Sequence, residues 1–118
     1  MTMERDEALA IIYQVQQQHP DLTASGFSNE RHARGHSLDP KAVGLCIEWL
    51  LRHDGLERRK TINTRRTSYS WKHIVERHFD TYIANGDFIC AALYLKYKMK
   101  KQSLNAYFNI KELKNALR

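Results

Sequence analysis

The chain has few cysteines, the residues that form the disulfides of small secreted domains and bind structural zinc. It contains only two cysteines, Cys46 and Cys90, and both lie within apolar helical patterns, without Cys-x-x-Cys spacing. This pattern argues against a disulfide framework and against a cysteine-rich metal site. We therefore expect both side chains to be small buried hydrophobic groups in a reducing compartment.

Long apolar runs are also missing. The longest uninterrupted one, from Phe88 to Leu95, is far shorter than the stretch of about 20 residues that a helix needs to cross a bilayer. The first residues lack the basic start and apolar run of a secretory signal peptide. We expect a soluble, cytoplasmic protein that does not associate with membranes.

Motifs that carry common chemistry are absent as well. The sequence has no nucleophile elbow, P-loop, dinucleotide fingerprint or His-Glu-x-x-His pattern. His32 and His36 are four residues apart, but Gly35 lies between them and no cysteine or carboxylate pattern accompanies them. We predict no enzyme, no catalytic residue, no cofactor and no metal site. A helical face with Tyr69, His73 and Glu76 is the remaining enzymatic hypothesis.

Acidic residues are scarce in the later part of the chain. The formal net charge is +6, yet residues 1–40 hold three Lys/Arg against six Asp/Glu, whereas residues 41–118 hold sixteen against seven. This asymmetry favours a polyanionic partner, such as nucleic acid, an acidic protein surface or an anionic membrane. The alternative is a basic surface that is merely solvated.

A chain of 118 residues with 42% hydrophobic residues suffices for one compact domain over 1–118. Helical spacing of apolar residues, together with Asp39-Pro40 as a helix start and Asn109 and Glu112 as a capping box, predicts about five helices. The expected fold is mainly α, a compact bundle with a long loop at 21–37 and a basic connector at 56–67. The predicted helices are 5–18, 40–53, 69–79, 88–101 and one from about 110 to 117.

Residues 68–101 hold most of the aromatic and ionisable side chains that could form a site. In the first predicted helix of this stretch, Tyr69, Lys72, His73 and Glu76 share a polar face, which suits either an anion site or an exposed ion-paired surface. We expect Asn85-Gly86 to form a left-handed turn, Asp87 to cap the second helix, and residues 40–53 to be the most buried helix. An aromatic and basic face of the second helix would stack on bases and neutralise phosphates; it comprises Tyr94, Tyr97, Lys98 and Lys101.

Five cations crowd the connector before the first of these helices. They repel one another unless an anion compensates them, which favours contacts with phosphate, although a solvated loop is the alternative. The residues are Arg58, Arg59, Lys60, Arg65 and Arg66.

The stretch SYSWKHIVERHFDTYIANGDFICAALYL resembles a segment of small, uncharacterised bacterial proteins encoded in accessory regions such as plasmids and phages. It covers about a quarter of the chain. The resemblance implies a family pattern without an assigned activity. Its members here are Ser68, Tyr69, Lys72, His73, Glu76, Tyr82, Asn85 and Gly86.

The sequence therefore predicts a small basic helical module that contacts nucleic acid, mainly through the phosphate backbone. The alternative is a protein-interaction module of an accessory genetic element, which engages a host complex or self-associates. The predicted nucleic-acid-binding residues are Arg58, Arg59, Lys60, Arg65, Arg66, Tyr69, Lys72, His73, Tyr94, Tyr97, Lys98 and Lys101.

Overall fold

The first helix follows directly from the spacing of apolar residues. A computed structural model describes residues 3–28, 37–54 and 58–112 of the chain. In it α1 (Arg5–Gln18) buries Ala8, Ile11, Ile12 and Val15 on one face, as a period of 3.6 residues requires. The predicted helix 5–18 is confirmed.

The start of α2 (Pro40–Asp54) is also as expected. Asp39 Oδ1 accepts a hydrogen bond from the Lys41 N–H at 3.1 Å, so that the side chain satisfies one of the free amides of the first turn. Pro40 fits this turn because it has no N–H to satisfy. The helix packs against both α1 and α4.

A threonine cap begins α3 (Ser68–Phe79), where Thr67 Oγ1 accepts from the Ser70 N–H. Trp71, Ile74 and Val75 are buried on one face. The helix ends at Asp80, which adopts a left-handed conformation with φ 51°.

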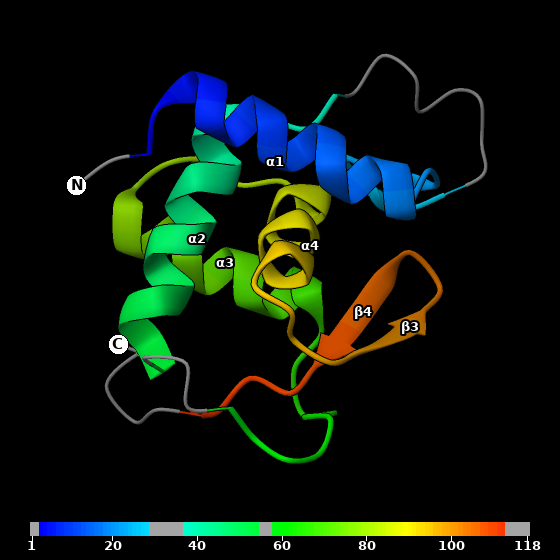
Figure 1. The fold of residues 1–118 in the computed structure, drawn as a ribbon. Helices are drawn as coiled ribbons and strands as arrows, with labels where there is room; N and C mark the ends of the chain where they lie inside the picture. The colour runs from blue at the N-terminus through cyan, green and yellow to red at the C-terminus, as the bar shows by residue number, and fades with distance from the viewer. Residues whose placement is uncertain (1–2, 29–36, 55–57, 113–118) are drawn as a thin grey trace.

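The central element is α4 (Asn85–Tyr94), which lies among the other three helices (Figure 1). It is buried continuously from Asn85 to Ala92, and it is enclosed on more sides than α2, which we expected to be the most buried helix. Asp87 is not its N-cap. The helix begins three residues earlier than expected, Ala84 is the N-cap, and Asn85 and Gly86 lie in the first turn without a left-handed φ.

The predicted continuation of this helix to Lys101 is wrong. The helix ends at Tyr94, and Lys96 turns the chain with φ 68°. Residues Met99–Gln102 then form β3, which pairs antiparallel with β4 (Asn105–Phe108), Met99 lying opposite Phe108. Pairing with β4 satisfies the backbone groups that a longer helix would have satisfied internally.

The segment expected as a long loop at 21–37 contains a short hairpin. Strands β1 (Leu22–Thr23) and β2 (Gly26–Phe27) pair antiparallel, and residues 29–36 lie outside the described part. The Phe27 N–H donates to the Leu104 carbonyl at 2.9 Å, so this hairpin is attached to the β3–β4 turn.

The last predicted helix does not begin where we expected. Residues 109–112 are not helical, and residues 113–118 lie outside the described part. The two expected capping groups have other partners: Asn109 bonds to the connector, and Glu112 pairs with Arg66 at 3.0 Å. The described residues thus form four helices and two hairpins rather than five helices, and the fold is compact and mainly helical.

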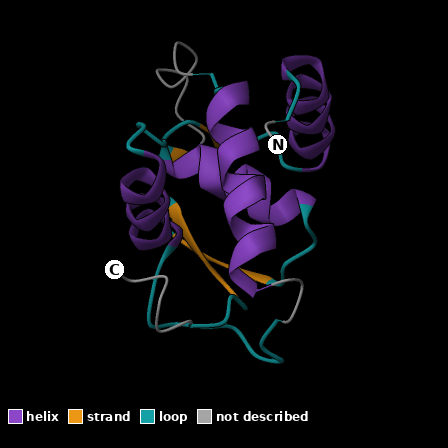
Figure 2. Cartoon of the chain, turned by 90° about the vertical axis from the view of Figure 1, so that its left-hand side faces the viewer, coloured by secondary structure: helices purple, strands orange, loops and turns teal. Residues whose placement is uncertain are grey.

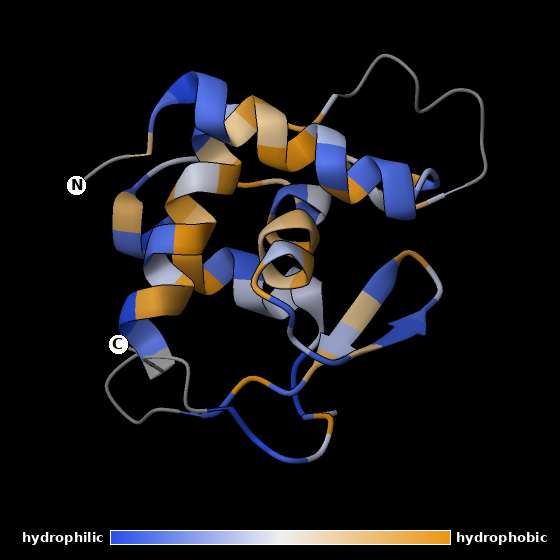
Figure 3. Ribbon diagram, viewed as in Figure 1, coloured by the Kyte–Doolittle hydropathy of each residue, from blue (hydrophilic) through white to orange (hydrophobic). Residues whose placement is uncertain are grey.

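One apolar cluster holds these elements together. Trp71, Phe88 and Phe108 are among its largest fully buried side chains, and the two cysteines are buried and unpaired, as the sequence predicted. Most hydrophobic residues of α1, α2 and α4 are buried. In Figure 3, β3 and the connector are largely hydrophilic. In the turned view the β3–β4 hairpin lies at one end of the helices, close to the connector (Figure 2).

Candidate functional site

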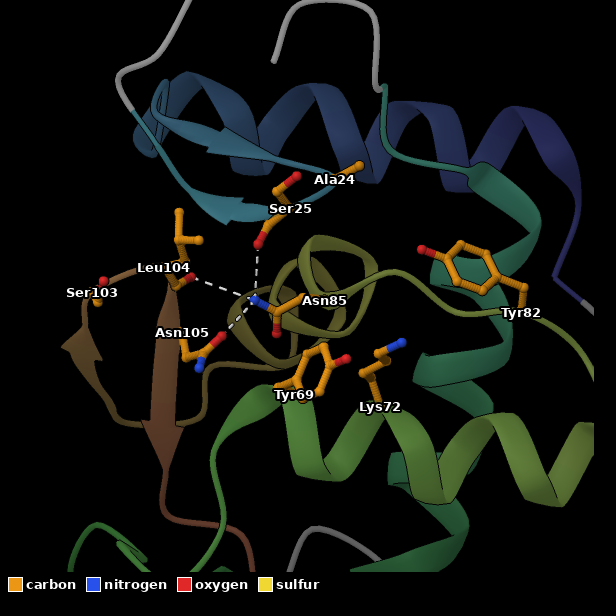
Figure 4. A pocket seen from close by; sticks show the side chains of 9 residues that line it. All are labelled: Ala24, Ser25, Tyr69, Lys72, Tyr82, Asn85, Ser103, Leu104 and Asn105. Atoms are coloured by element: carbon orange, nitrogen blue, oxygen red, sulfur yellow. Dashed lines mark hydrogen bonds between the residues drawn. The ribbon is translucent and has the colours of Figure 1, made fainter. Parts of the chain in front are cut away.

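A cleft of about 740 Å³ opens where α3, the start of α4 and the turns of both hairpins meet (Figure 4). Its walls come from four segments that are far apart in the sequence. The lining residues are Ala24, Ser25, Tyr69, Lys72, Tyr82, Asn85, Ser103, Leu104 and Asn105.

Lys72 supplies the charged group of the cleft. Its side chain is only 6% exposed, and Nζ lies 3.2 Å from Glu76 Oε1, one helical turn further on. The same ammonium lies 4.9 Å from the ring centroid of Tyr69 and 5.1 Å from that of Tyr82. A buried ammonium needs such compensation, since burial disfavours the charged form. We had expected Lys72 to lie on an open basic surface. It is instead part of the cleft.

Glu76 connects this charge to the backbone. Its Oε2 accepts from the Ile83 N–H at 3.1 Å, and Oε1 also lies 2.7 Å from His73 Nδ1. Burial by itself would raise the pKa of Glu76, but the hydrogen bonds from Ile83 and Lys72 outweigh it and lower the pKa. The carboxylate therefore stays ionised beside Lys72.

The predicted polar face of α3 thus exists, but it is only partly exposed. Tyr69 is 51% exposed and its ring meets the His73 ring edge to face, with the two centroids 4.6 Å apart. Tyr69 lines the cleft, whereas His73 lies beside it on the exposed side of the helix. The ion pair between Lys72 and Glu76 is the one expected from their spacing.

Asn85 provides an unused acceptor. Its Nδ2 lies 3.0 Å from the Ser25 carbonyl, 3.5 Å from the Leu104 carbonyl and 2.9 Å from Asn105 Oδ1. The two backbone carbonyls fix the orientation of the Asn85 amide, because Oδ1 in the place of Nδ2 would face both of them with a lone pair. Asn85 is 6% exposed, and its Oδ1 is buried without a hydrogen-bond partner.

Two glycines allow the hairpins to approach Asn85. A Cβ on Gly26, whose φ is +119°, would lie 2.1 Å from the Leu104 carbonyl oxygen, and a Cβ on Gly86 would lie 1.8 Å from the Thr23 carbonyl oxygen. The Gly86 N–H donates to the Ala24 carbonyl at 2.9 Å. The cleft is therefore enclosed by direct backbone contacts, which leave no room for side chains at these positions.

The basic connector lies along the β3–β4 hairpin. Asn63 forms a bridge with Phe108, and Asn109 joins the connector to the residue before β3, since its Nδ2 donates to the Arg59 carbonyl at 2.8 Å and its Oδ1 accepts from the Lys98 N–H at 2.7 Å. Lys98 Nζ also donates to the Lys60 carbonyl. Two cationic segments are thus brought side by side.

We call the exposed and half-exposed cations on these two segments the basic surface. No carboxylate of the described residues forms an ion pair with any of them. They are Arg58, Arg59, Lys60, Arg65, Lys98 and Lys100.

Four of the predicted site residues lie elsewhere or are already engaged. Arg66 pairs with Glu112 at 3.0 Å, and Lys101 Nζ lies 3.0 Å from Asp21 Oδ2. Tyr97 is 5% exposed under the Arg58 guanidinium, and Tyr94 packs on the core. The face predicted from helical spacing therefore does not form, because the helix ends before three of its four members.

Sequence reasoning missed most of the cleft. Ser25, Ser103, Leu104 and Asn105 lie in turns that only the fold brings together, and Asn85 was interpreted as a turn residue. The one available signal was the resemblance, whose pattern includes Asn85 together with Tyr69, Lys72 and Tyr82.

Compared with protein-family models, curated proteins and solved structures, the chain gives no match. None of the described helices is long and apolar enough to span a bilayer. Within residues 3–28, 37–54 and 58–112, no three His, Cys, Asp or Glu side chains are grouped closely enough to hold a metal ion. His32 and His36, which we considered as ligands, lie outside those ranges.

Proposed function

We propose that this protein binds nucleic acid through the basic surface, mainly by contacts with phosphates. The observation that supports it is the pairing of two cationic segments, residues 58–65 and 98–100, across Asn109. Lys98 directly precedes β3, Lys100 lies on it, and both side chains are exposed, so the two lysines extend the row of charge. Cations held together without carboxylate partners among the described residues repel one another, and a bound polyanion relieves that repulsion.

The proposed basic surface keeps five of the twelve binding residues that the sequence predicted, leaves out seven and adds one. Arg58, Arg59, Lys60, Arg65 and Lys98 remain from the sequence prediction, and Lys100 is added by its position on β3. The resemblance to bacterial accessory-genome proteins, the cytoplasmic location and the absence of enzymatic activity stay predictions.

The test is fluorescence anisotropy of labelled single-stranded and duplex oligonucleotides at two salt concentrations. We expect dissociation constants of about 1–100 µM that rise steeply with salt. A variant with Arg59→Gln, Lys60→Gln, Lys98→Gln and Lys100→Gln should bind more weakly, and its salt slope should fall by about 3, since each lost phosphate contact contributes roughly 0.7–0.9.

A matched control removes four exposed cations of the helices that do not belong to the basic surface: Arg5→Gln, Lys41→Gln, Arg52→Gln and Arg77→Gln. Both variants lose the same charge from the formal net +6, so a general charge effect would weaken both equally. Equal loss in the two variants, or no binding at low salt, would refute the proposed surface.

A protein partner is the second candidate function. Leu9 and Tyr13, one helical turn apart on α1, are 42% and 62% exposed. Such a pair suits a helix-on-helix contact with another protein or a second copy. Light scattering and a pull-down from nuclease-treated lysate distinguish this candidate, since a protein partner survives nuclease and a nucleic-acid bridge does not.

A further inference from the structure

Exposed apolar side chains gather at the cleft. The large hydrophobic residues exposed in the described part are Leu9, Tyr13, Leu51, Tyr69, Tyr82 and Leu104, and the last three all line it. Single exposed hydrophobic residues are ordinary, but three at one concave site favour a ligand with an apolar or aromatic face.

The buried acceptor defines what else the ligand must offer. Asn85 Oδ1 has lost contact with bulk water and has no donor in the protein, an arrangement that costs free energy until a donor arrives. Because Nδ2 is held by three acceptors, the amide cannot turn its Oδ1 away. A ligand that fits here presents an N–H or O–H group to Asn85.

Lys72, in contrast, requires a hydrogen-bond acceptor on the ligand. An ammonium has three N–H donors, and among the described residues only Glu76 accepts a hydrogen bond from one of them. Figure 4 shows Lys72 and Asn85 bordering the same cleft, with the Tyr82 ring on the far side of Lys72. The cleft therefore offers one acceptor, one charged donor and an exposed aromatic ring together.

We propose that the cleft receives one nucleobase of a bound single strand. The base would stack on the ring of Tyr82, donate an N–H to Asn85 Oδ1 and accept from Lys72 Nζ. Every base carries a donor beside an acceptor on its edge and has a π-face, so this pocket recognises an unpaired base without selecting its identity. The inference rests on the proposed function and adds a preference for single strands.

The experiment compares two labelled strands of equal length at low salt, one with bases and one fully abasic, which share the phosphate backbone. Tyr82→Ala is a safe probe because that side chain is 73% exposed. It should weaken binding of the base-bearing strand about tenfold, as loss of one stacked base does, and leave its salt slope and the affinity for the abasic strand unchanged. Tyr13→Ala, which removes an exposed tyrosine of α1, should change neither strand.

The outcomes separate the two proposals. If both strands bind equally to the original protein, and Tyr82→Ala changes nothing, the base pocket is refuted while backbone binding stands. If Tyr82→Ala and Tyr13→Ala weaken binding alike, the effect is not that of the cleft, and the pocket is again refuted. If neither strand binds at low salt, the proposed function fails and this inference fails with it.

Discussion

Asp87 shows how one side chain joins two helices. Its Oδ1 accepts from the Asp39 N–H at 2.9 Å and its Oδ2 from the Ala84 N–H at 3.0 Å, so the carboxylate satisfies backbone amides at the start of both α2 and α4. The sequence suggested an acidic group at a helix start but not this double role. Burial raises the pKa of Asp87 to about 6, although the two N–H donors act in the opposite direction.

This raised pKa predicts a pH dependence of stability. Unfolded, the carboxyl has an ordinary pKa of about 3.9. Between about pH 4 and 6 the folded protein therefore holds a proton that the unfolded chain has released, and the contribution of Asp87 to the free energy of unfolding falls as pH rises. In total this contribution to the free energy of unfolding should fall by about 2–3 kcal/mol across the window. Below and above the window it should not change with pH.

Asp87→Asn isolates the effect, because the amide does not titrate. Urea unfolding of both proteins from pH 4 to 7 gives the difference in free energy of unfolding at each pH. We expect the original protein to lose stability relative to the variant as pH rises through this range. A difference that does not change with pH would contradict the assignment.

At the scale of elements, a glycine governs how α4 meets the first hairpin. Gly86 lies in the first turn of the helix and has an ordinary helical φ. Glycine is needed here because there is no space for a Cβ, not because the backbone is left-handed. The nearest obstacle to a Cβ is the backbone carbonyl of Thr23, which cannot move without displacing the hairpin.

Gly86→Ala should therefore destabilise the protein by roughly 1–3 kcal/mol, the usual cost of forcing an extra methyl group into a packed contact. The matched control is Gly44→Ala on α2, where the nearest atom is the side-chain Cβ of Met3 at 3.3 Å. Because Met3 can shift and alanine favours a helix, this change should be neutral or stabilise by up to about 1 kcal/mol. Thermal unfolding of both variants checks the prediction, and equal midpoints would contradict it.

At the scale of the whole molecule, the reactivity of the two cysteines measures how readily the shared core opens. Cys46 on α2 and Cys90 on α4 are both fully buried. Burial raises the pKa of Cys90 to about 12 and also raises that of Cys46. The reactive thiolate is therefore both rare and inaccessible in the folded protein.

We expect both thiols to react with a disulfide reagent such as DTNB only when the core opens, at rates that rise with sub-denaturing urea. The control is the same reaction in full denaturant, where both should react at once. Rapid reaction of either cysteine in the native protein would show that its end of the core opens locally.

The sequence by itself determined α1, α2 and α3, with the starts of α2 and α3 close to where the structure has them. Apolar residues three and four positions apart and a capping side chain beside the first turn act over short distances, so their effect is visible in the order of residues. The burial of Cys46 and Cys90 followed from the same pattern.

Only the tertiary structure decided where α4 ends and where the cleft lies. Residues 95–101 suit a helix locally, but pairing with β4 and the left-handed turn at Lys96 impose a strand. Asn85 is held by the carbonyls of Ser25 and Leu104 and by Asn105, and a backbone acceptor leaves no trace in the sequence because every residue has one. Contacts between distant segments therefore set both features.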